Sequence, residues 1–313
     1  MMFFQVSNVF ALTRDGDERL ERRSALQTLT ARESDAIDFF MECDMDTDKG
    51  NDAAGRELLQ WSQWQLMDSV LPTGGFAHSY GLEAAVQTQF VTSPLDLKPY
   101  IVQVLENTGS LLLPFVYCAY ISPDIANWSK LDKLLEATLT NEVSRKASAS
   151  QGSALLRVAA SVYLEVPSLK RMRDAYLGSG TAYFHHAPIF GLICGLLGFD
   201  SNTCQKMYLF TTMRDVISAA TRLNLIGPLG ASVLQHQLAP VAERITKKWM
   251  DHPVEEACQV APLLDTVQGL LGHNNVACLP KLRFSSLFAL ARDGDELLLR
   301  RSALQKPTAR EIE

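Results

Sequence analysis

Residues 201–228 read SNTCQKMYLFTTMRDVISAATRLNLIGP, and this stretch decides the fold. Ser201 is typical of a helix N-cap, and apolar side chains then recur at helical spacing as far as Leu223. Gly227-Pro228 ends the pattern, because proline is not tolerated beyond the first turn of a helix. The stretch therefore predicts one long helix with a clear start and a clear end.

The same pattern extends over residues 57–272, where long apolar-periodic segments alternate with short breakers. We find no convincing run of alternating β-branched residues, which would indicate strands. Helix starts are predicted at Ser93-Pro94 and Pro188, and helix ends at Leu71-Pro72, Gly178 and Gly198. The sequence thus predicts an all-α domain of about ten helices.

Composition limits the class of protein. The chain has 313 residues, of which 47% are hydrophobic, so it can bury a full-sized core. A formal net charge of -6 and a pI of about 5.6 argue against a protein that coats nucleic acid or binds membranes through basic residues.

The six cysteines include no CxxC pair, which favours reduced thiols in an intracellular compartment. The most apolar run, residues 111–121, is too short for a bilayer and contains Pro114, so no membrane span is expected.

The two ends of the chain resemble each other. FALTRDGDERLERRSALQTLTARE begins at Phe10, and FALARDGDELLLRRSALQKPTARE begins at Phe288. Two copies under separate structural constraint would normally diverge further, so a recent duplication or a gene-model artefact is favoured. We predict polar tails outside the fold at residues 1–56 and 273–313.

An acidic stretch at residues 42–52, ECDMDTDKGND, has part of the spacing of a calcium loop. Counted from Asp44, the first carboxylate positions of an EF-hand are filled. Lys49 stands where glycine is required, however, and Gly55 stands where the closing glutamate belongs. A flexible acidic linker is therefore the better interpretation.

The stretch SVLPTGGFAHSYGLEAA, residues 69–85, places three glycines, a histidine and a glutamate between two helical patterns. It lacks the lysine of a Walker loop, and the residues before it read as helix instead of the strand that precedes a dinucleotide fingerprint. Gly74-Gly75 indicates a sharp break between helices, and Gly81 a point of close backbone approach. We therefore expect no nucleotide site in this glycine-rich stretch.

Histidines supply the candidate metal ligands. His78 lies near Glu83 in the glycine-rich stretch, but a histidine beside aromatic residues is more often a core or interface group. His185 and His186 are the better pair by composition. Adjacent side chains on a helix point about 100° apart and so seldom share an ion, although Pro188 places the pair near a helix start. A structural role is preferred, and direct metal binding stays open.

Spacing singles out a ridge of small side chains. Ser144, Ser148 and Gly152 fall four residues apart, so they share a helix face and let another helix approach closely. Packing within the core is the preferred interpretation of this ridge.

Two arginines share a face of the 201–223 helix. Arg214 and Arg222 lie four residues before and after Ser218, so the three side chains share one face. This face is either a solvated edge of the helix or a protein-binding patch, and composition favours the solvated edge.

No nucleophile elbow, zinc-protease motif or cysteine-nucleophile signature occurs in the sequence. From these residues alone, the sequence predicts a helical protein that binds other proteins.

Several separated motifs together resemble the UreF family of urease accessory proteins, most closely its plant branch. They are SVLPTGGFAHSYGLEAA, NEVSRKASASQGSALLRVA, FHHAPIFGLICGLLG and YLFTTMRDVISAATRLNLIGPLGASVLQ, in this order along the chain. The resemblance covers residues 57–269, and several motifs matched in order are far more specific than any one of them.

The resemblance implies an all-α protein that is not itself an enzyme. UreF-like proteins form a homodimer in the cytoplasm that bridges a UreD/UreH-type partner and the GTPase UreG, and the assembly inserts nickel into apo-urease. Nickel is handled by the complex, no cofactor is bound stably, and neither nucleic acid nor a membrane is a partner. The residues to which the resemblance assigns partner-binding or functional roles are Pro72, Gly74, Phe76, Ser79, Gly81, Leu82, Glu83, Gln151, Gly152, His185, His186, Pro188, Arg222, Gly227 and Pro228.

Three alternatives to this scaffold stay open. In the first, His185 and His186 hold nickel directly and the protein is a metallochaperone. In the second, the protein is an enzyme, which requires a closed polar pocket that gathers His78, Glu83 and the two adjacent histidines. The third is a helical interaction module without the urease role, because the chain after Gly269 departs from the family's usual ending.

Deleting residues 284–313 should leave the helical domain folded, because most of this segment repeats the polar N-terminal tail. We expect the melting temperature of the shortened chain to stay within about 2 °C of that of the full chain. Differential scanning calorimetry of both chains tests this. A decrease of about 10 °C would show that the deleted segment is part of the fold.

Overall fold

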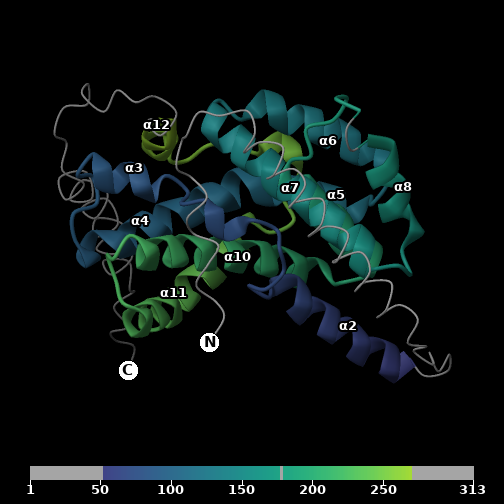
Figure 1. The fold of residues 1–313 in the computed structure, drawn as a ribbon, viewed down its shortest axis with the longest axis horizontal. Helices are drawn as coiled ribbons and strands as arrows, with labels where there is room; N and C mark the ends of the chain where they lie inside the picture. The colour runs from purple at the N-terminus through teal and green to yellow at the C-terminus, as the bar shows by residue number, and fades with distance from the viewer. Residues whose placement is uncertain (1–51, 177–178, 270–313) are drawn as a thin grey trace, which may run out of the picture. The chain divides into compact units, whose positions relative to one another are not determined.

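A computed structural model describes residues 52–176 and 179–269 (Figure 1). The chain divides into two units, Met1–Gly55 and Arg56–Glu313, and apart from the first residues of α2 the helices below belong to the second unit. Within the described residues there are helices and no strand, which confirms the predicted all-α class.

The α-helices are α2 (Asp52–Met67), α3 (Leu82–Gln87), α4 (Pro94–Asn107), α5 (Leu113–Ile121), α6 (Ile125–Thr138), α7 (Glu142–Val162), α8 (Pro167–Tyr176), α9 (His186–Leu197), α10 (Ser201–Arg222), α11 (Pro228–Trp249) and α12 (Pro262–Gly269). Two short 3-10 turns, η1 (Gly75–Ala77) and η3 (Val254–Glu256), and a π-helical turn, η2 (Thr108–Leu112), lie between them.

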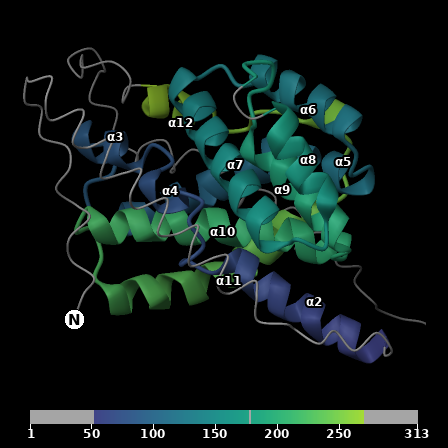
Figure 2. The same ribbon diagram turned by 45° about the vertical axis from the view of Figure 1, so that its right-hand side comes forward.

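Helix α10 joins two hydrophobic cores. Its N-terminal half contributes Met207 and Tyr208 to the first core, and its C-terminal half contributes Met213 and Val216 to the second. It packs against α4, α5, α9 and α11, and it lies beside α11 in Figures 1 and 2. The stretch that decides the fold in the sequence is thus the helix that both cores share.

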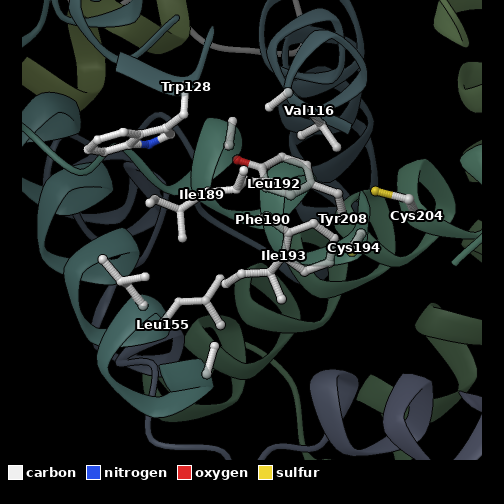
Figure 3. Close-up of a cluster of buried hydrophobic side chains, with 14 of the residues drawn as sticks. Val116, Trp128, Leu155, Ile189, Phe190, Leu192, Ile193, Cys194, Cys204 and Tyr208 are labelled. Atoms are coloured by element: carbon white, nitrogen blue, oxygen red, sulfur yellow. The ribbon is translucent and has the colours of Figure 1, made fainter. Parts of the chain in front are cut away.

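The first core surrounds α9, which is apolar almost all round. Figure 3 shows Ile193 of this helix near Leu155 of α7, and the Phe190 ring lies against Tyr208 of α10 with the ring centres 5.3 Å apart. Gly191 lies so close to α5 that a Cβ there would collide with the carbonyl oxygen of Val116. Because α9 is buried on nearly every side, its sequence needs no polar face.

The second core lies between α3, α4, α10, α11 and α12. Leu82, Tyr100 and Leu238, from three of these helices, have no exposed surface. The Tyr100 hydroxyl donates to the carbonyl oxygen of Tyr80 at 2.8 Å. This core therefore also holds the glycine-rich stretch in place.

Helix starts follow the sequence signals, with two shifts. Helix α9 begins at His186, two residues before the predicted start at Pro188, because proline is tolerated anywhere in the first turn. Ser93-Pro94 begins α4 as predicted, and the Asp96 carboxylate accepts hydrogen bonds from the Ser93 amide and hydroxyl at 3.0 and 3.1 Å. The prediction of Ser201 as an N-cap is wrong by one residue. Asp200 caps α10 instead, because its carboxylate reaches the amide of Thr203 at 2.9 Å.

Only some of the predicted helix ends, and neither predicted domain limit, can be compared with the structure. Gly198 follows α9 with a left-handed φ of 79°, as predicted for a helix end, whereas α2 ends at Met67, before the predicted stop at Leu71-Pro72. Gly178 and almost all of the acidic stretch lie outside the described residues. The predicted limits of the domain at residues 56 and 272 therefore stay predictions.

The run Pro94–Ile121, through α4, η2 and α5, has the length and hydropathy of a membrane span. In the folded chain, however, 61% of its apolar 18-residue window is buried. Leu105 and Phe115 of this run belong to the second and the first core respectively. Its apolar character is thus used in packing against other helices.

Replacing Gly191 by alanine should destabilise the protein by about 3 kcal/mol, because the new methyl group would collide with the backbone of α5. Gly227→Ala is the matched control, since nothing lies within 4 Å of the position of its Cβ. Urea denaturation of the two variants gives both free energies of unfolding. Equal free energies of unfolding for the two variants would show that α5 and α9 can move slightly apart without loss of stability.

Candidate functional site

The glycine-rich stretch forms one wall of a cavity of about 200 Å³. Residues 77–81 and Glu83 come from this stretch, and the other walls come from α4, η2, α7, α9, α10 and α12. Segments far apart in the sequence, among them the ridge on α7 and the start of α9, therefore meet at one place. This cavity is the candidate functional site.

Glycines allow the stretch to turn sharply and to pack closely. Gly74 and Gly81 have left-handed φ angles of 74° and 82°, which favour glycine. A Cβ at Gly75 would collide with the Asp215 carboxylate, and one at Gly81 would collide with the side chain of Gln268. The predicted close approach at Gly81 is confirmed, and its neighbour is α12.

Tyr80 ties the glycine-rich stretch to two helices. Its backbone is left-handed, with φ of 51°, and its carbonyl oxygen accepts hydrogen bonds from the Tyr100 hydroxyl at 2.8 Å and the Gln268 amide at 2.9 Å. Burial, and then the charge of Asp215, raise the pKa of the Tyr80 hydroxyl far above its usual range. Tyr80 is therefore a neutral, half-buried group that fixes this wall of the cavity.

Helix α10 places an ion pair behind the same stretch. Arg214 Nη2 and Nε donate to Asp215 Oδ1 at 2.9 and 3.0 Å, and the guanidinium lies 4.8 Å from the centre of the Phe76 ring. Arg214 also donates to the carbonyl oxygen of Met67. Burial raises the pKa of the Asp215 carboxyl, and the Arg214 charge offsets part of this rise. Of the two arginines on the predicted face, Arg214 belongs to the interior, and only Arg222 is exposed.

His185 and His186 have different surroundings. His185 has no exposed surface, and its Nε2 lies 2.9 Å from the Glu136 carboxylate. Burial lowers the pKa of His185, although the charges of Asp132 and Glu136 oppose this. Asp132, itself buried, accepts hydrogen bonds from the Tyr183 and His185 amides, both at 2.7 Å. His185 is thus part of a buried polar cluster that shapes the start of α9.

His186 instead lines the cavity. Its ring packs on Tyr208 with the ring centres 5.3 Å apart, and its amide donates to Ser148 Oγ at 3.1 Å. Burial, and then the charges of His78 and Arg214, lower the pKa of His186 to about 4. The imidazole is therefore uncharged at neutral pH.

The ridge of small side chains on α7 is a place of close packing, as predicted. A Cβ at Gly152 would collide with the carbonyl oxygen of Phe184, in the turn before α9. Ser144 Oγ donates to Gln268 Oε1 of α12 at 2.6 Å. The ridge therefore receives the turn before α9 and one end of α12.

Gln151 and His186 separate the cavity from a smaller void of about 20 Å³. Gly75, Arg214 and Asp215 line the far side of this void. Its size suffices for about one water molecule, which these polar groups could bind.

The structure gathers only part of the predicted site in the cavity. The predicted residues that line it are Ser79, Gly81, Glu83, Gln151 and His186. The predicted residues outside its lining are Pro72, Gly74, Phe76, Leu82, Gly152, His185, Pro188, Arg222, Gly227 and Pro228. His78 joins the first group, but His185 does not, so the full set required for the enzyme alternative is not gathered.

Nickel binding by the adjacent histidines stays a prediction. Among the described residues, no three or more His, Cys, Asp or Glu side chains are grouped so that they could hold a metal ion. The ring of His185 contacts Glu136 and that of His186 contacts Tyr208, so the two rings do not face one shared position. Equilibrium dialysis with nickel is the direct test of the metallochaperone alternative.

Arg222, Gly227 and Pro228 lie together at the turn between α10 and α11. Arg222 ends α10 and donates to Ser218 Oγ at 3.1 Å, Gly227 is the N-cap of α11, and Pro228 is its first residue. The next side chain, Leu229, is 80% exposed. An exposed apolar side chain near an exposed arginine is typical of a protein contact surface.

Helix α2 exposes a surface that the sequence analysis missed. Trp61 and Trp64 are 66% and 49% exposed, and their rings meet edge to face with the centres 4.9 Å apart. Leu58, on the same side of the helix, is 66% exposed, whereas Leu66 is buried in the first core. The segment WSQW within a helical pattern was the available sequence signal.

The described residues define an all-α protein with large apolar side chains exposed on α2 and at the start of α11. The chain is 68% identical over 229 residues to urease accessory protein F of Oryza sativa subsp. japonica, covering 73% of this chain and 88% of that protein. It is 66% identical over 215 residues to urease accessory protein F of Arabidopsis thaliana, covering 69% and 90%. It is also 28% identical over 214 residues to urease accessory protein UreF of Trichodesmium erythraeum, covering 67% and 91%. A sequence model of the UreF family matches residues 91–239, and the chain belongs to this family.

Stability should fall as pH decreases from about 6.5 to about 4, in part through His186. The folded state holds its ring neutral with a pKa of about 4, whereas the unfolded chain takes up the proton near the usual value of 6.5. This contribution is fully present above pH 6.5, and up to about 3 kcal/mol of it is lost by pH 4.

Urea denaturation at pH 7 and pH 4.5 measures the loss. His186→Gln should reduce the difference between the two pH values, and the exposed His236→Gln should leave it unchanged. An unchanged difference in His186→Gln would contradict the assigned neutral state.

Proposed function

We propose that this chain is a urease maturation scaffold, which bridges a UreD/UreH-type partner and the GTPase UreG so that nickel is inserted into apo-urease. Family membership over most of the helical domain supports the urease role. The exposed tryptophan pair on α2 is the observation that carries the scaffold role. In this proposal nickel is the cargo of the assembled complex, and the chain itself binds no cofactor stably.

The tryptophan pair supports a docking surface. Large apolar side chains gathered at one exposed place mark interaction sites, and tryptophan is enriched among the residues that dominate binding energy. Trp61 and Trp64 also restrict each other's motion through their edge-to-face contact, so less entropy is lost when a partner covers them. We assign this surface to the UreD/UreH-type partner.

Two exposed charges are assigned to UreG. Glu83 lies in the first turn of α3, at the rim of the cavity, and Arg222 lies in the last turn of α10. One polar group from a partner can position or stabilise the reacting groups of a GTPase, as an arginine finger does. The scaffold thereby modulates GTP hydrolysis by UreG without being an enzyme itself.

A second copy of the chain is assigned to the start of α11. Leu229 and Val233 are 80% and 50% exposed and lie one helical turn apart, so they form an apolar strip. A homodimer through this strip leaves α2 of each copy available for the UreD/UreH-type partner. We place the complex in the cytoplasm, and the net charge of -6 disfavours nucleic acid as a partner.

The test is reconstitution of the complex from this chain, the UreD/UreH-type partner and UreG of the same source. Size-exclusion chromatography with light scattering should give one stable species that contains all three. The double variant Trp61→Ser/Trp64→Ser should bind the UreD/UreH-type partner at least about tenfold more weakly, because it removes both anchors. Circular dichroism establishes that the variant is folded.

Leu134→Ser is the matched control, since Leu134 is 46% exposed on α6, away from α2 in the sequence. It should bind as the unchanged chain does. A folded chain that forms no complex would refute the scaffold role. Equal binding by the double variant and the control would refute the assignment of the docking surface.

A further inference from the structure

The cavity at the glycine-rich stretch is large enough for an organic ligand. Its volume is about 200 Å³, whereas one water molecule requires only about 10–15 Å³ measured in the same way. Part of its wall is apolar, with Leu111 and Leu112 from η2 and Val143 from α7. The cavity thus offers an apolar surface, which a hydrated inorganic ion would not use.

The charges in the wall are negative. Glu83 and Asp265 line the cavity, and no Lys or Arg is among the described residues that do so. His78 and His186 add no positive charge at neutral pH, because burial lowers the pKa of both rings. The wall therefore favours a cation over an anion.

The arginines close to the cavity are already paired. Arg214, beyond His186, forms an ion pair with Asp215, and Arg145 on α7 lies 3.7 Å from the carboxylate of Glu136. These pairings reduce the positive potential that either guanidinium projects into the cavity. The negative character of the wall is thus retained.

Hydrogen-bonding capacity is also available at the wall. The neutral ring of His186 has one acceptor and one donor nitrogen, and it makes no hydrogen bond with any described residue. Asp265 Oδ2 accepts a hydrogen bond from Thr140 at 2.7 Å, which leaves Oδ1 for a ligand. The carboxylate of Glu83 is in no ion pair within the described part of the chain, and its side chain is exposed at the rim.

We propose that this cavity binds a small organic cation, with an ammonium or guanidinium group on a short apolar stem. Glu83 and Asp265 provide the carboxylates for the charged group, and Leu111, Leu112 and Val143 cover the stem. A chelated metal ion fits less well, because no three ligating side chains are grouped for it among the described residues. The cavity lies within a single chain and needs no partner protein, so this proposal does not depend on the scaffold role.

The first test is isothermal titration calorimetry of the full chain at pH 7 with n-butylguanidinium and with N-butylurea, which has nearly the same shape and no charge. We expect one site per chain and an affinity for n-butylguanidinium about tenfold higher than for N-butylurea. At a concentration of about 100 times Kd, n-butylguanidinium should also raise Tm by about 5 °C. Equal affinity for the two compounds, or no binding of either, would overturn the proposal.

Three variants locate the site. Glu83→Gln should weaken binding of n-butylguanidinium about tenfold, and Glu165→Gln, which removes an exposed carboxylate outside the cavity lining, should not. Ala147→Phe should abolish binding, because Ala147 lines the cavity and the larger side chain fills it. Circular dichroism verifies folding, and Ala147→Leu replaces Ala147→Phe if the latter does not fold. Unchanged binding in Glu83→Gln, or in a folded cavity-filling variant, would overturn the proposal.

Discussion

The turn at residues 183–186 is the constraint on which the rest of the structure depends. Asp132, buried on α6, accepts hydrogen bonds from three successive backbone amides of this turn at 2.7, 3.2 and 2.7 Å. The Phe184 and His185 amides are buried, and each would otherwise cost about 1–3 kcal/mol as a buried group without a partner. Gly152 lets α7 cross directly over the turn, so α9 begins in the interior, packs against both α5 and α7, and carries His186 into the cavity wall.

The helices could be predicted from the sequence because their signals are local. Apolar spacing and a capping residue lie within the segment that they describe, and α4 begins at Ser93-Pro94 for this reason. The start of α10 shows the limit of such signals. Ser201 and Asp200 can both cap a helix, but the Ser201 hydroxyl bonds to Asp251 at 2.9 Å, a residue that is distant in the sequence.

The candidate site could be predicted only in part, because its geometry depends on contacts between distant segments. The resemblance pointed to the glycine-rich stretch and helical spacing pointed to the ridge on α7, and both contribute to one cavity. Spacing could not show that Arg214 would be enclosed by Phe76 and the carbonyl of Met67, nor that Glu136 and Tyr208 would be the neighbours of the two histidine rings. Asp132 gave no signal at all, since the amides that it binds lie about fifty residues further along the chain.

The pairing of α5 with α9 has a consequence for how the protein is made. These helices contact each other extensively, yet α6, α7 and α8 lie between them in the sequence. During synthesis α5 leaves the ribosome well before α9 exists, and its apolar surface is uncovered for that interval. We therefore expect chaperones that recognise exposed apolar segments to bind the nascent chain until the residues of α9 emerge and cover α5.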